Sequence, residues 1–392
     1  MPEFGALGIE YIRPGAVVRP LCGRPEVFPR GLQCVAMMAK DARARDARLS
    51  GLADAASVLL SGVDDESRLE AAVASLDELF RELTGIREDA ADARDRTAIA
   101  LAAGSAISPL DAGRCLLDPR RTAIYLRGVH GAIQEAQQRF PGEVIQVVYA
   151  GCGPFAPLCL PLLPLLAGQA VRFTLLDVHA RAVECVQAIL AALRLEGGNA
   201  ECLVCDATRY RHPDDRRLHV VVSETMQRAL EKEPQVAILM NLAPQLTAGG
   251  LMVPERIAVD AVLTDLSREF GGDGVRPQPW SGRVALGPVL ELTRERVCAW
   301  AAAGVTSHLP PARIMLPSLV AAQCSLVLTT SIRTFGAHQL REYDSGLTHP
   351  LMVHGWRAGE EVELTYRLGE RPGFHLERSG PRPVSQPPGD WV

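Results

Sequence analysis

The stretch VIQVVYAGCGPFAPL at residues 144–158 is the most informative part of this chain. Its apolar start, VIQVVY, predicts a buried parallel strand that ends on a tight GCG turn at 151–153, where a ligand can approach the bare backbone. A second apolar run at 171–176 predicts the next strand, and Asp177 follows it directly. Backbone amides in such a turn face the charged part of a ligand, while a carboxylate at the next strand end accepts from ribose hydroxyls. The pattern therefore predicts a nucleoside site.

The glycine turn by itself is weak evidence, because a lone GxG is often only a turn. The acid at the next strand end strengthens the prediction. A third glycine at the dinucleotide spacing is missing, since Ala156 and Pro157 stand there. Without the close helix approach that a pyrophosphate needs, S-adenosylmethionine (SAM) is favoured over NAD.

Strands alternate with helices through the middle of the chain, which predicts a parallel sheet covered on both faces. Ligands bind such sheets at the carboxyl ends of the strands. The expected strands are 144–150, 171–176, 200–205, 218–223 and the start of one at 251–253, and the expected helices are 120–140, 180–195 and 234–246.

Cofactor contacts are expected from the strand ends and from the helix that leads into the glycine strand. Asp177 is expected at the ribose, with a helix N-cap as its alternative role, and Asp206 near the adenine amine, with a loop cap as its alternative. The full set is Tyr149, Ala150, Gly151, Gly153, Pro154, Asp177, Val178, Asp206, Ala207 and Ser223, with Tyr125 and Arg127 from the helix.

The flanking regions differ from this core. Helical periodicity covers 35–103, with an amphipathic helix at 66–84 and a short Ala-rich helix at 94–103. Beyond residue 255 the pattern changes to short strands. We therefore expect a helical cap or lid at 1–140, a SAM-binding α/β domain at 141–255 and a β-rich domain for substrate or dimerisation at 256–392. The later strands are expected at 257–263, 283–290, 325–330 and 361–368, with one helix at 293–303.

Composition excludes several classes of protein. A net charge of −5 and a pI near 6.0 argue against nucleic-acid binding, which usually needs a basic surface. Prolines and glycines interrupt the apolar stretch 144–166, which argues against a membrane span. The beginning of the sequence does not resemble a signal peptide, and the ten cysteines have irregular spacings, so we expect reduced thiols and a cytoplasmic protein. Cys202 and Cys205 form a lone CxxC without a second pair, so no metal site is expected.

Two of the three acids in the segment SETMQRALEKE at 223–233 indicate a second function for the same edge of the sheet. Glu224 follows the strand at 218–223, and Glu233 lies nine positions later. Two carboxylates opening into the pocket can hold a guanidinium or amine for attack on a sulfonium methyl. The alternative is a solvated turn, because Glu231 and Glu233 also precede a helix, where negative charge is favoured. Glu224 and Glu233 are the candidate catalytic residues.

These motifs resemble those of class I SAM-dependent methyltransferases, and the SE pair, the later acid and LTAGGLMVPER at 246–256 are similar to the double-glutamate loop of protein arginine methyltransferases. The resemblance implies a Rossmann-like α/β domain followed by a β-barrel, with SAM at Gly151, Gly153 and Asp177 and a guanidinium held by Glu224 and Glu233. It also implies a homodimer. The family's Thr-His-Trp loop has only Thr348-His349-Pro350 as its nearest match, so we expect a bacterial-type relative acting on a small molecule.

Three functions follow as hypotheses. The first is SAM-dependent methylation of a small amine- or guanidine-bearing metabolite or amino acid, as in natural-product biosynthesis. The second is internal cyclisation of SAM with release of methylthioadenosine, as in enzymes of the azetidine carboxylate synthase type. The third is a SAM-fold subunit that binds without catalysis. Products formed from SAM alone separate the first two, and SAM binding separates both from the third.

Overall fold

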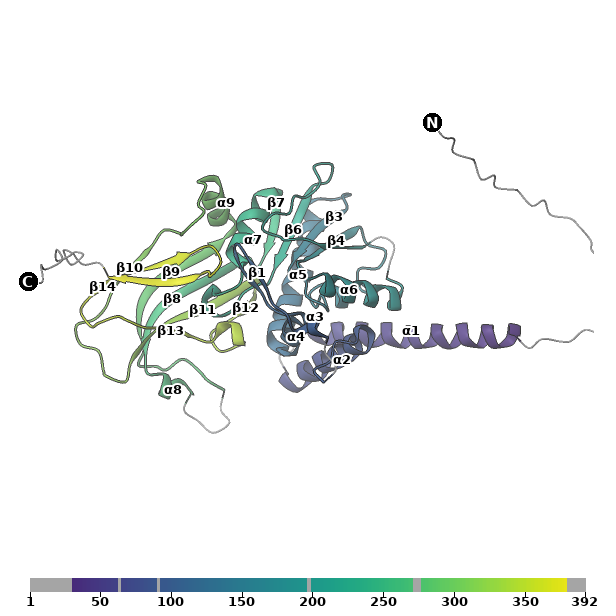
Figure 1. Cartoon of the computed structure of the whole chain (residues 1–392), viewed down its shortest axis with the longest axis horizontal. Coiled ribbons are helices and arrows are strands. Elements are labelled where there is room, and N and C mark those ends of the chain that lie inside the picture. Colours follow the sequence, from purple (N-terminus) through teal and green to yellow (C-terminus); the bar gives the residue numbers. More distant parts are fainter. Residues whose placement is uncertain (1–29, 63–64, 90–91, 196–198, 271–275, 379–392) are drawn as a thin grey trace, which may run out of the picture. The chain divides into compact units, whose positions relative to one another are not determined.

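Five parallel strands form the central sheet in the order β5-β4-β3-β6-β7 (Figure 1), in a computed structural model that describes residues 30–62, 65–89, 92–195, 199–270 and 276–378. The strands are β3 (Ile145–Ala150), β4 (Val171–Asp177), β5 (Ala200–Val204), β6 (Leu218–Ser223) and β7 (Leu246–Val253). Every residue of β3 and β6 is buried, as their continuous apolar sequences predict for inner parallel strands. The chain moves outward from β3 through β4 to β5, then returns to the other side of β3 for β6. This reversal between β3 and β6 is where open α/β sheets bind ligands.

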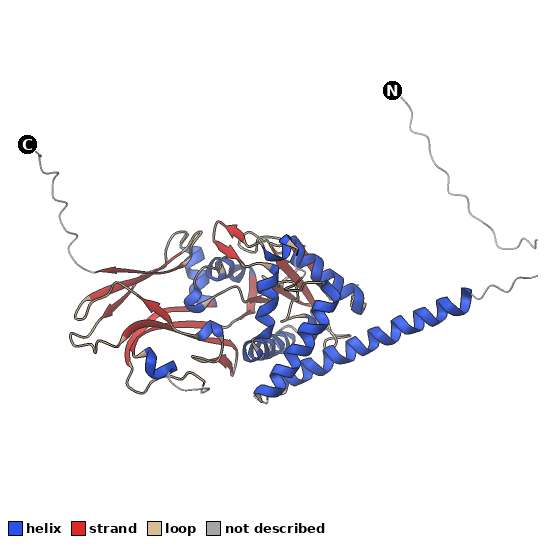
Figure 2. Cartoon of the chain, turned by 60° about the horizontal axis from the view of Figure 1, so that its bottom comes forward, coloured by secondary structure: helices blue, strands red, loops and turns tan. Residues whose placement is uncertain are grey.

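Helices α5 (Pro119–Arg139), α6 (Ala180–Leu193) and α7 (Gln235–Leu242) pack against this sheet, and α2 (Glu66–Thr84) packs against α5 and α6 (Figure 2). The start of α5 is defined by Asp118, whose side chain accepts the Arg121 N–H, and by Pro119 in the first turn. The connection from β3 to β4 contains turns and one 3-10 helix, η2 (Leu160–Leu162), because its prolines remove the backbone donors that an α-helix needs.

The chain divides into two compact units, Met1–Ala44 and Arg45–Val392. Helix α1 (Arg30–Leu60) begins in the first unit and ends in the second, and all remaining elements belong to the second unit. The helix expected at 94–103 is wrong. Only α3 (Ala93–Arg96) is helical there, and β1 (Ile99–Leu101) then pairs with β2 (Gly104–Ala106). Gly104 has a φ of +143° and packs against the backbone of residues 232–234, so tertiary contact overrides the helix preference of alanine. Helix α4 (Pro109–Arg114) and η1 (Cys115–Leu117) lead from this hairpin to α5.

The region after β7 consists of two antiparallel sheets, one with the order β12-β11-β8-β9 plus β13 on β11, the other with the order β10-β14-β15. The fold is therefore the predicted one, a Rossmann-like parallel sheet followed by a β-rich region. The strands are β8 (Arg256–Thr264), β9 (Val284–Thr293), β10 (Ala312–Met315), β11 (Ser325–Phe335), β12 (His338–Leu340), β13 (Leu351–Val353), β14 (Glu361–Arg367) and β15 (Gly373–Arg378). The helical segments after β7 are α8 (Leu266–Phe270), α9 (Arg294–Ala302) and the 3-10 helix η5 (Gly346–Thr348). Two further 3-10 helices, η3 (Arg228–Leu230) and η4 (Ala243–Gln245), lie between β6 and β7.

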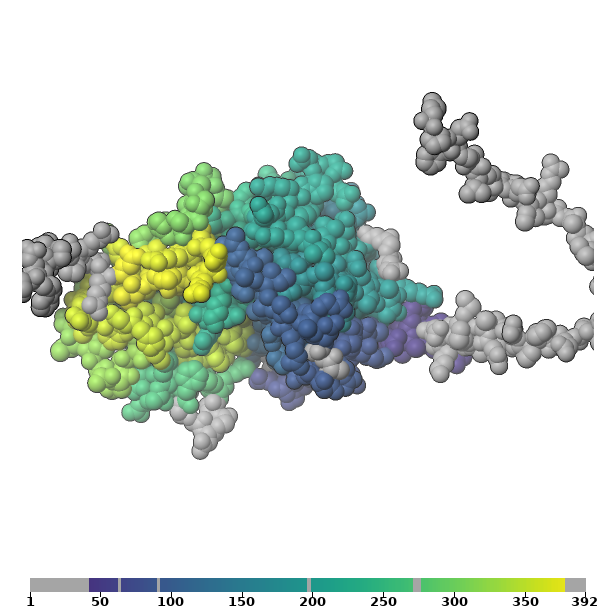
Figure 3. Space-filling view, viewed as in Figure 1, coloured from purple at the N-terminus to yellow at the C-terminus, as the bar shows by residue number. Residues whose placement is uncertain are grey.

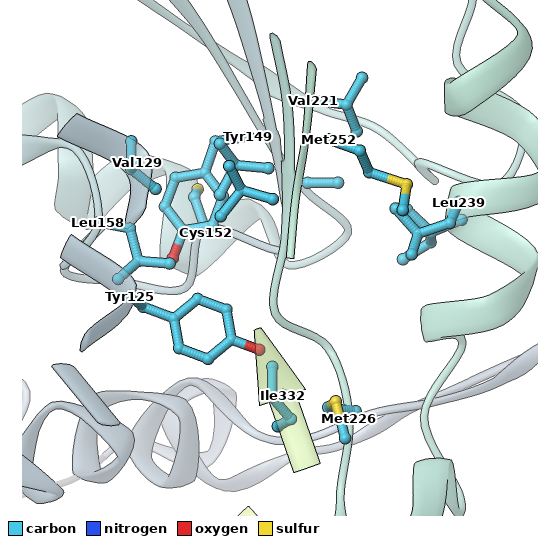
Figure 4. Close-up of a cluster of buried hydrophobic side chains, with 14 of the residues drawn as sticks. Tyr125, Val129, Tyr149, Cys152, Leu158, Val221, Met226, Leu239, Met252 and Ile332 are labelled. Carbon is cyan, nitrogen blue, oxygen red and sulfur yellow. The ribbon is translucent and has the colours of Figure 1, made fainter. Parts of the chain in front are cut away.

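Helix α5 joins the parallel sheet to the β-rich region through a very close contact with β11. The Thr334 hydroxyl donates to the Ile124 carbonyl on α5 at 3.0 Å. A Cβ added to Gly128 would lie 2.5 Å from the Thr334 Oγ1 and 3.2 Å from its backbone carbon, so only glycine fits there. Buried side chains from both regions meet beside this contact, among them Tyr125, Met226 and Ile332 (Figure 4).

We predict that Gly128→Ala lowers the free energy of unfolding by about 1–3 kcal/mol, because the new methyl group forces α5 away from β11. Gly51→Ala is the matched control, since Gly51 lies in a helix and a Cβ added there would have no other atom within 4 Å. That control is expected to be neutral or to stabilise by up to about 1 kcal/mol. Urea denaturation of both variants measures the difference, and equal effects would contradict the close packing described for α5.

Candidate functional site

The glycine turn and Asp177 meet at the carboxyl ends of β3 and β4. Gly151 and Gly153 have φ values of +70° and +62°, a region that suits glycine. The Gly153 N–H donates to Oδ2 of Asp177 at 2.8 Å, and the His179 N–H donates to Oδ1 at 2.8 Å. Burial raises the pKa of Asp177, while these two backbone donors act in the opposite direction. Each carboxylate oxygen retains lone-pair capacity for a further donor from a ligand.

A cavity of about 640 Å³ opens over these strand ends, within the range of about 300–1,000 Å³ usual for small-molecule sites. Its wall includes both the glycine turn and the two acids, Glu224 and Glu233, so the predicted cofactor site and the predicted acceptor site share one cavity. The predicted residues that line it are Tyr149, Gly151, Gly153, Pro154, Asp177, Val178, Asp206, Ala207, Glu224 and Glu233. Ala150 and Ser223 are fully buried behind the wall and do not line it.

Helix α5 lines the cavity through Arg121, not through Tyr125 and Arg127 as we expected. Tyr125 is fully buried and points toward Ile332 of β11 (Figure 4). Arg127 is buried as well, and its Nε donates to the Leu59 carbonyl at 2.7 Å. Only the first turn of α5 reaches the ligand edge of the sheet, and Arg127 lies about 9 Å further along the axis at 1.5 Å per residue. The capping sequence Asp118-Pro119 marks that first turn in the sequence, but it does not indicate that the turn reaches the ligand edge.

Glu224 enters the cavity directly from the end of β6. Gln235 holds the backbone on both sides of Glu224. Its Oε1 accepts from the Thr225 N–H at 2.8 Å, and its Nε2 donates to the Ser223 carbonyl at 3.1 Å. One carboxylate oxygen of Glu224 forms an ion pair with Arg121. The side chain is only 8% exposed, and its other oxygen, Oε1, has no hydrogen-bond partner within the described residues. A buried carboxylate oxygen without a donor is energetically costly, so this atom is suited to a cationic ligand.

Glu233 is the second carboxylate of the loop and is 7% exposed. Burial raises its pKa to about 7, and the positive charge of Arg121 and a hydrogen bond from Gln227 act in the opposite direction. Near neutral pH this group therefore exchanges a proton readily, which is a property expected of a general acid or base.

The backbone between the two acids adopts conformations that its residues disfavour. Ala229, Leu230 and Lys232 have positive φ values of 48°, 62° and 69°. Left-handed conformations of non-glycine residues cost about 1 kcal/mol or more each and persist only where the surroundings hold them. The loop therefore needs support from outside itself.

That support comes from the β-rich region and from the β1–β2 hairpin. The Tyr366 hydroxyl donates to the Leu230 carbonyl at 2.7 Å, and the Thr330 Oγ1 accepts from the Ala229 N–H at 3.2 Å. Lys232 donates its N–H to the Pro372 carbonyl at 2.9 Å and accepts from the Ser105 N–H at 2.8 Å. Figure 3 shows the dark blue hairpin region next to the yellow C-terminal strands. Elements distant in sequence thus hold the loop in place.

The segment with the nearest match to a Thr-His-Trp motif also borders the cavity. Asp118, the cap of α5, accepts from the Ser345 hydroxyl at 2.6 Å and from the Gly346 N–H at 3.3 Å. This contact fixes η5, and Leu347 and His349 line the cavity beyond it. Burial lowers the pKa of His349, and the nearby Arg228 lowers it further. In the sequence this segment is only an incomplete match to the family's Thr-His-Trp loop, and its residues were not among the predicted site residues.

Comparisons with known proteins give little further guidance. No family model matches the chain, and no curated protein matches it. Among solved structures, the Trypanosoma brucei PRMT1 enzyme-prozyme heterotetrameric complex with AdoHcy is 14% identical in sequence, with a TM-score of 0.44. The match covers 68% of this chain and 92% of that chain. At this TM-score the similarity does not establish a shared family.

Membrane spans and metal clusters are both absent from the described residues. None of the helices there combines the length and apolar character needed to cross a membrane. The same residues contain no group of three or more His, Cys, Asp or Glu side chains arranged to hold a metal ion.

The raised pKa of Glu233 predicts a pH-dependent stability. Its pKa is about 7 in the folded chain against an ordinary value of 4.5, so the folded state holds the extra proton between these pH values. Stability from this group is complete below about pH 4.5 and is lost as the pH rises through 7. We predict that Glu233→Gln exceeds the wild type in unfolding free energy by roughly 1–3 kcal/mol at pH 8 and by little at pH 5.

Urea denaturation at the two pH values measures this difference. Glu231→Gln, from the same loop, is the control and is expected to leave the pH dependence of the wild type unchanged. If Glu233→Gln keeps the wild-type pH dependence, Glu233 does not titrate near neutral pH in the folded chain.

Proposed function

We propose that this protein is a SAM-dependent methyltransferase that acts on a nitrogen of a small guanidine- or amine-bearing molecule. The observation that carries the proposal is that one cavity is lined by both Asp177 and Glu224, whose Oε1 has no hydrogen-bond partner among the residues that the structure describes. The first is suited to a nucleoside and the second to a cation.

The residues present fit an adenosyl cofactor. Asp177 faces the cavity with spare lone pairs for ribose hydroxyls, and the glycine turn leaves its backbone accessible. Asp206 uses one oxygen, Oδ1, to accept from Thr208, which leaves Oδ2 for an adenine amine. Val178 and Ala207 supply apolar wall beside it. Arg121 also lines the cavity, where it is paired with Glu224, and its positive charge is suited to the carboxylate of the methionine portion.

The chemistry then divides between cofactor and protein. When bound, SAM supplies an electrophilic methyl group on a sulfonium, which leaves as a neutral thioether. Glu224 and Glu233 hold and orient the cationic acceptor by charge-assisted hydrogen bonds, so that binding energy is used for alignment. An ammonium acceptor loses one proton before its nitrogen attacks the methyl group, and a guanidinium acceptor loses one as its nitrogen is alkylated. Glu233, with a pKa of about 7, is the group we assign to accept that proton.

Paired variants test whether the two ends of the cavity have these separate roles. Asp177→Asn is expected to weaken SAM binding about 10- to 100-fold, because it loses a charged acceptor for the ribose. Glu224→Gln is expected to keep the SAM affinity within about threefold and to lower kcat at least about 100-fold. Calorimetry measures SAM binding, and mass spectrometry measures S-adenosylhomocysteine formed with L-arginine, L-lysine, L-ornithine or their decarboxylated amines.

Three results of these measurements would contradict the proposal. Methylthioadenosine formed from SAM alone would indicate cyclisation instead of methyl transfer. Absence of SAM binding by the wild type would indicate a different role for the cavity. Full turnover by Glu224→Gln would contradict the role given to this carboxylate.

A further variant tests the support of the loop. Tyr366→Phe removes the donor to the Leu230 carbonyl and leaves a strained, buried segment without one of its restraints, at a cost of about 1–3 kcal/mol in stability. We predict a kcat at least about tenfold lower with SAM affinity within about twofold, because Tyr366 contacts the loop between Glu224 and Glu233 and not the residues around Asp177. Tyr210→Phe, at another buried tyrosine, is the control. Equal kcat values for both variants would contradict a positioning role for Tyr366.

A further inference from the structure

One guanidinium at the cavity wall lacks a counter-charge. Arg228 starts η3, lines the cavity and is exposed to solvent. Its side chain makes neither a hydrogen bond nor an ion pair in the part of the chain that the structure describes. By contrast, Arg121 in the same cavity is paired with Glu224.

The nearby acids do not supply that partner. Glu224 is paired with Arg121, and Glu233 is engaged by Gln227, the residue directly before Arg228. Asp118, on the His349 side, already accepts from Ser345, from Gly346 and from the start of α5. Arg228 therefore lines the cavity with a positive charge that no acid among the described residues pairs with.

The loop that carries Glu224, Arg228 and Glu233 therefore brings charges of both signs to the cavity wall. Gln227 contacts Glu233, and Arg228 follows it in sequence, so the acid pair and the unpaired guanidinium belong to adjoining parts of the wall. His349, whose pKa is affected by the charge of Arg228, lies on the same side. A ligand bound along this part of the wall can contact both the carboxylates and the guanidinium.

From this juxtaposition we propose that the methyl acceptor is a free zwitterionic amino acid, with its basic side-chain group held by Glu224 and Glu233 and its α-carboxylate held by Arg228. The proposal rests on the proposed function and narrows it. Guanidinium–carboxylate pairs bind through two parallel hydrogen bonds, which gives orientation as well as affinity. A residue within a polypeptide has no free α-carboxylate at this position, so Arg228 would select free amino acids over internal protein residues.

Matched probes that differ only in the carboxylate test this assignment. The pairs are L-arginine with agmatine, L-lysine with cadaverine and L-ornithine with putrescine. Calorimetric titration of the wild type saturated with S-adenosylhomocysteine is expected to detect at least one amino acid and to give a Kd about tenfold or more lower than for its decarboxylated partner. This measurement does not depend on turnover.

The variant Arg228→Met keeps the length of the aliphatic side chain and removes the charge. It is expected to raise the Kd and KM of the preferred amino acid about tenfold, with kcat within about threefold and the decarboxylated partner unaffected. Arg228→Lys is expected to restore part of the preference, since it keeps the charge without the bidentate geometry. Arg357→Ala, at an arginine with a 70% exposed side chain far along the sequence, is the control and should behave as the wild type.

Failure of this inference and failure of the proposed function give different results. Equal affinity for both members of every pair, no binding of any amino acid, or an unchanged Kd in Arg228→Met would overturn the role of Arg228 while leaving methyl transfer open. For example, a wild type that binds SAM and methylates agmatine or a diamine as efficiently as the amino acid would overturn the role of Arg228 but not the proposed methyl transfer. A wild type that does not bind SAM or S-adenosylhomocysteine overturns the proposed function and this inference together.

Discussion

The candidate site depends on a loop held in a backbone conformation that its own side chains disfavour. Three non-glycine residues, Ala229, Leu230 and Lys232, are left-handed between the two acids. Their conformation is maintained by hydrogen bonds from Tyr366, Thr330 and the backbones of a hairpin and a strand turn. Disfavoured backbone conformations of this kind persist only where contacts from the surrounding structure hold them, and they are common at functional sites. The β-rich region thus shapes the site of the parallel-sheet region.

The sheet order explains why this loop and the nucleoside end share one cavity. β3 and β6 are neighbours, so the glycine turn after β3 and Glu224 after β6 emerge side by side at the carboxyl edge. From β3 the chain continues to β4, and from β6 it continues to β7 on the opposite side of the sheet. Open α/β sheets bind ligands between the two loops that diverge in this way. Helix α5 closes this site from another side by bringing Arg121 to Glu224.

Much of the sheet could be predicted from sequence, because continuous apolar runs and the glycine turn are local signals. β3, β4, β5 and β6 begin and end within a few residues of the expected positions. The acids at the strand ends follow from the same reasoning. What could not be predicted depends on distant contacts. Gly104 turns an Ala-rich segment into a hairpin by packing on residues 232–234, and Arg121 was missed because the axial position of α5 relative to the sheet is a tertiary property.

A crystal structure with S-adenosylhomocysteine tests the central claim most directly, because that claim concerns one cavity with two chemically different ends. We predict ribose hydroxyls within hydrogen-bond distance of the Asp177 carboxylate, with the sulfur directed toward Glu224 and Glu233. A nucleoside bound elsewhere on the chain, or bound here with its sulfur directed away from the two acids, would contradict it.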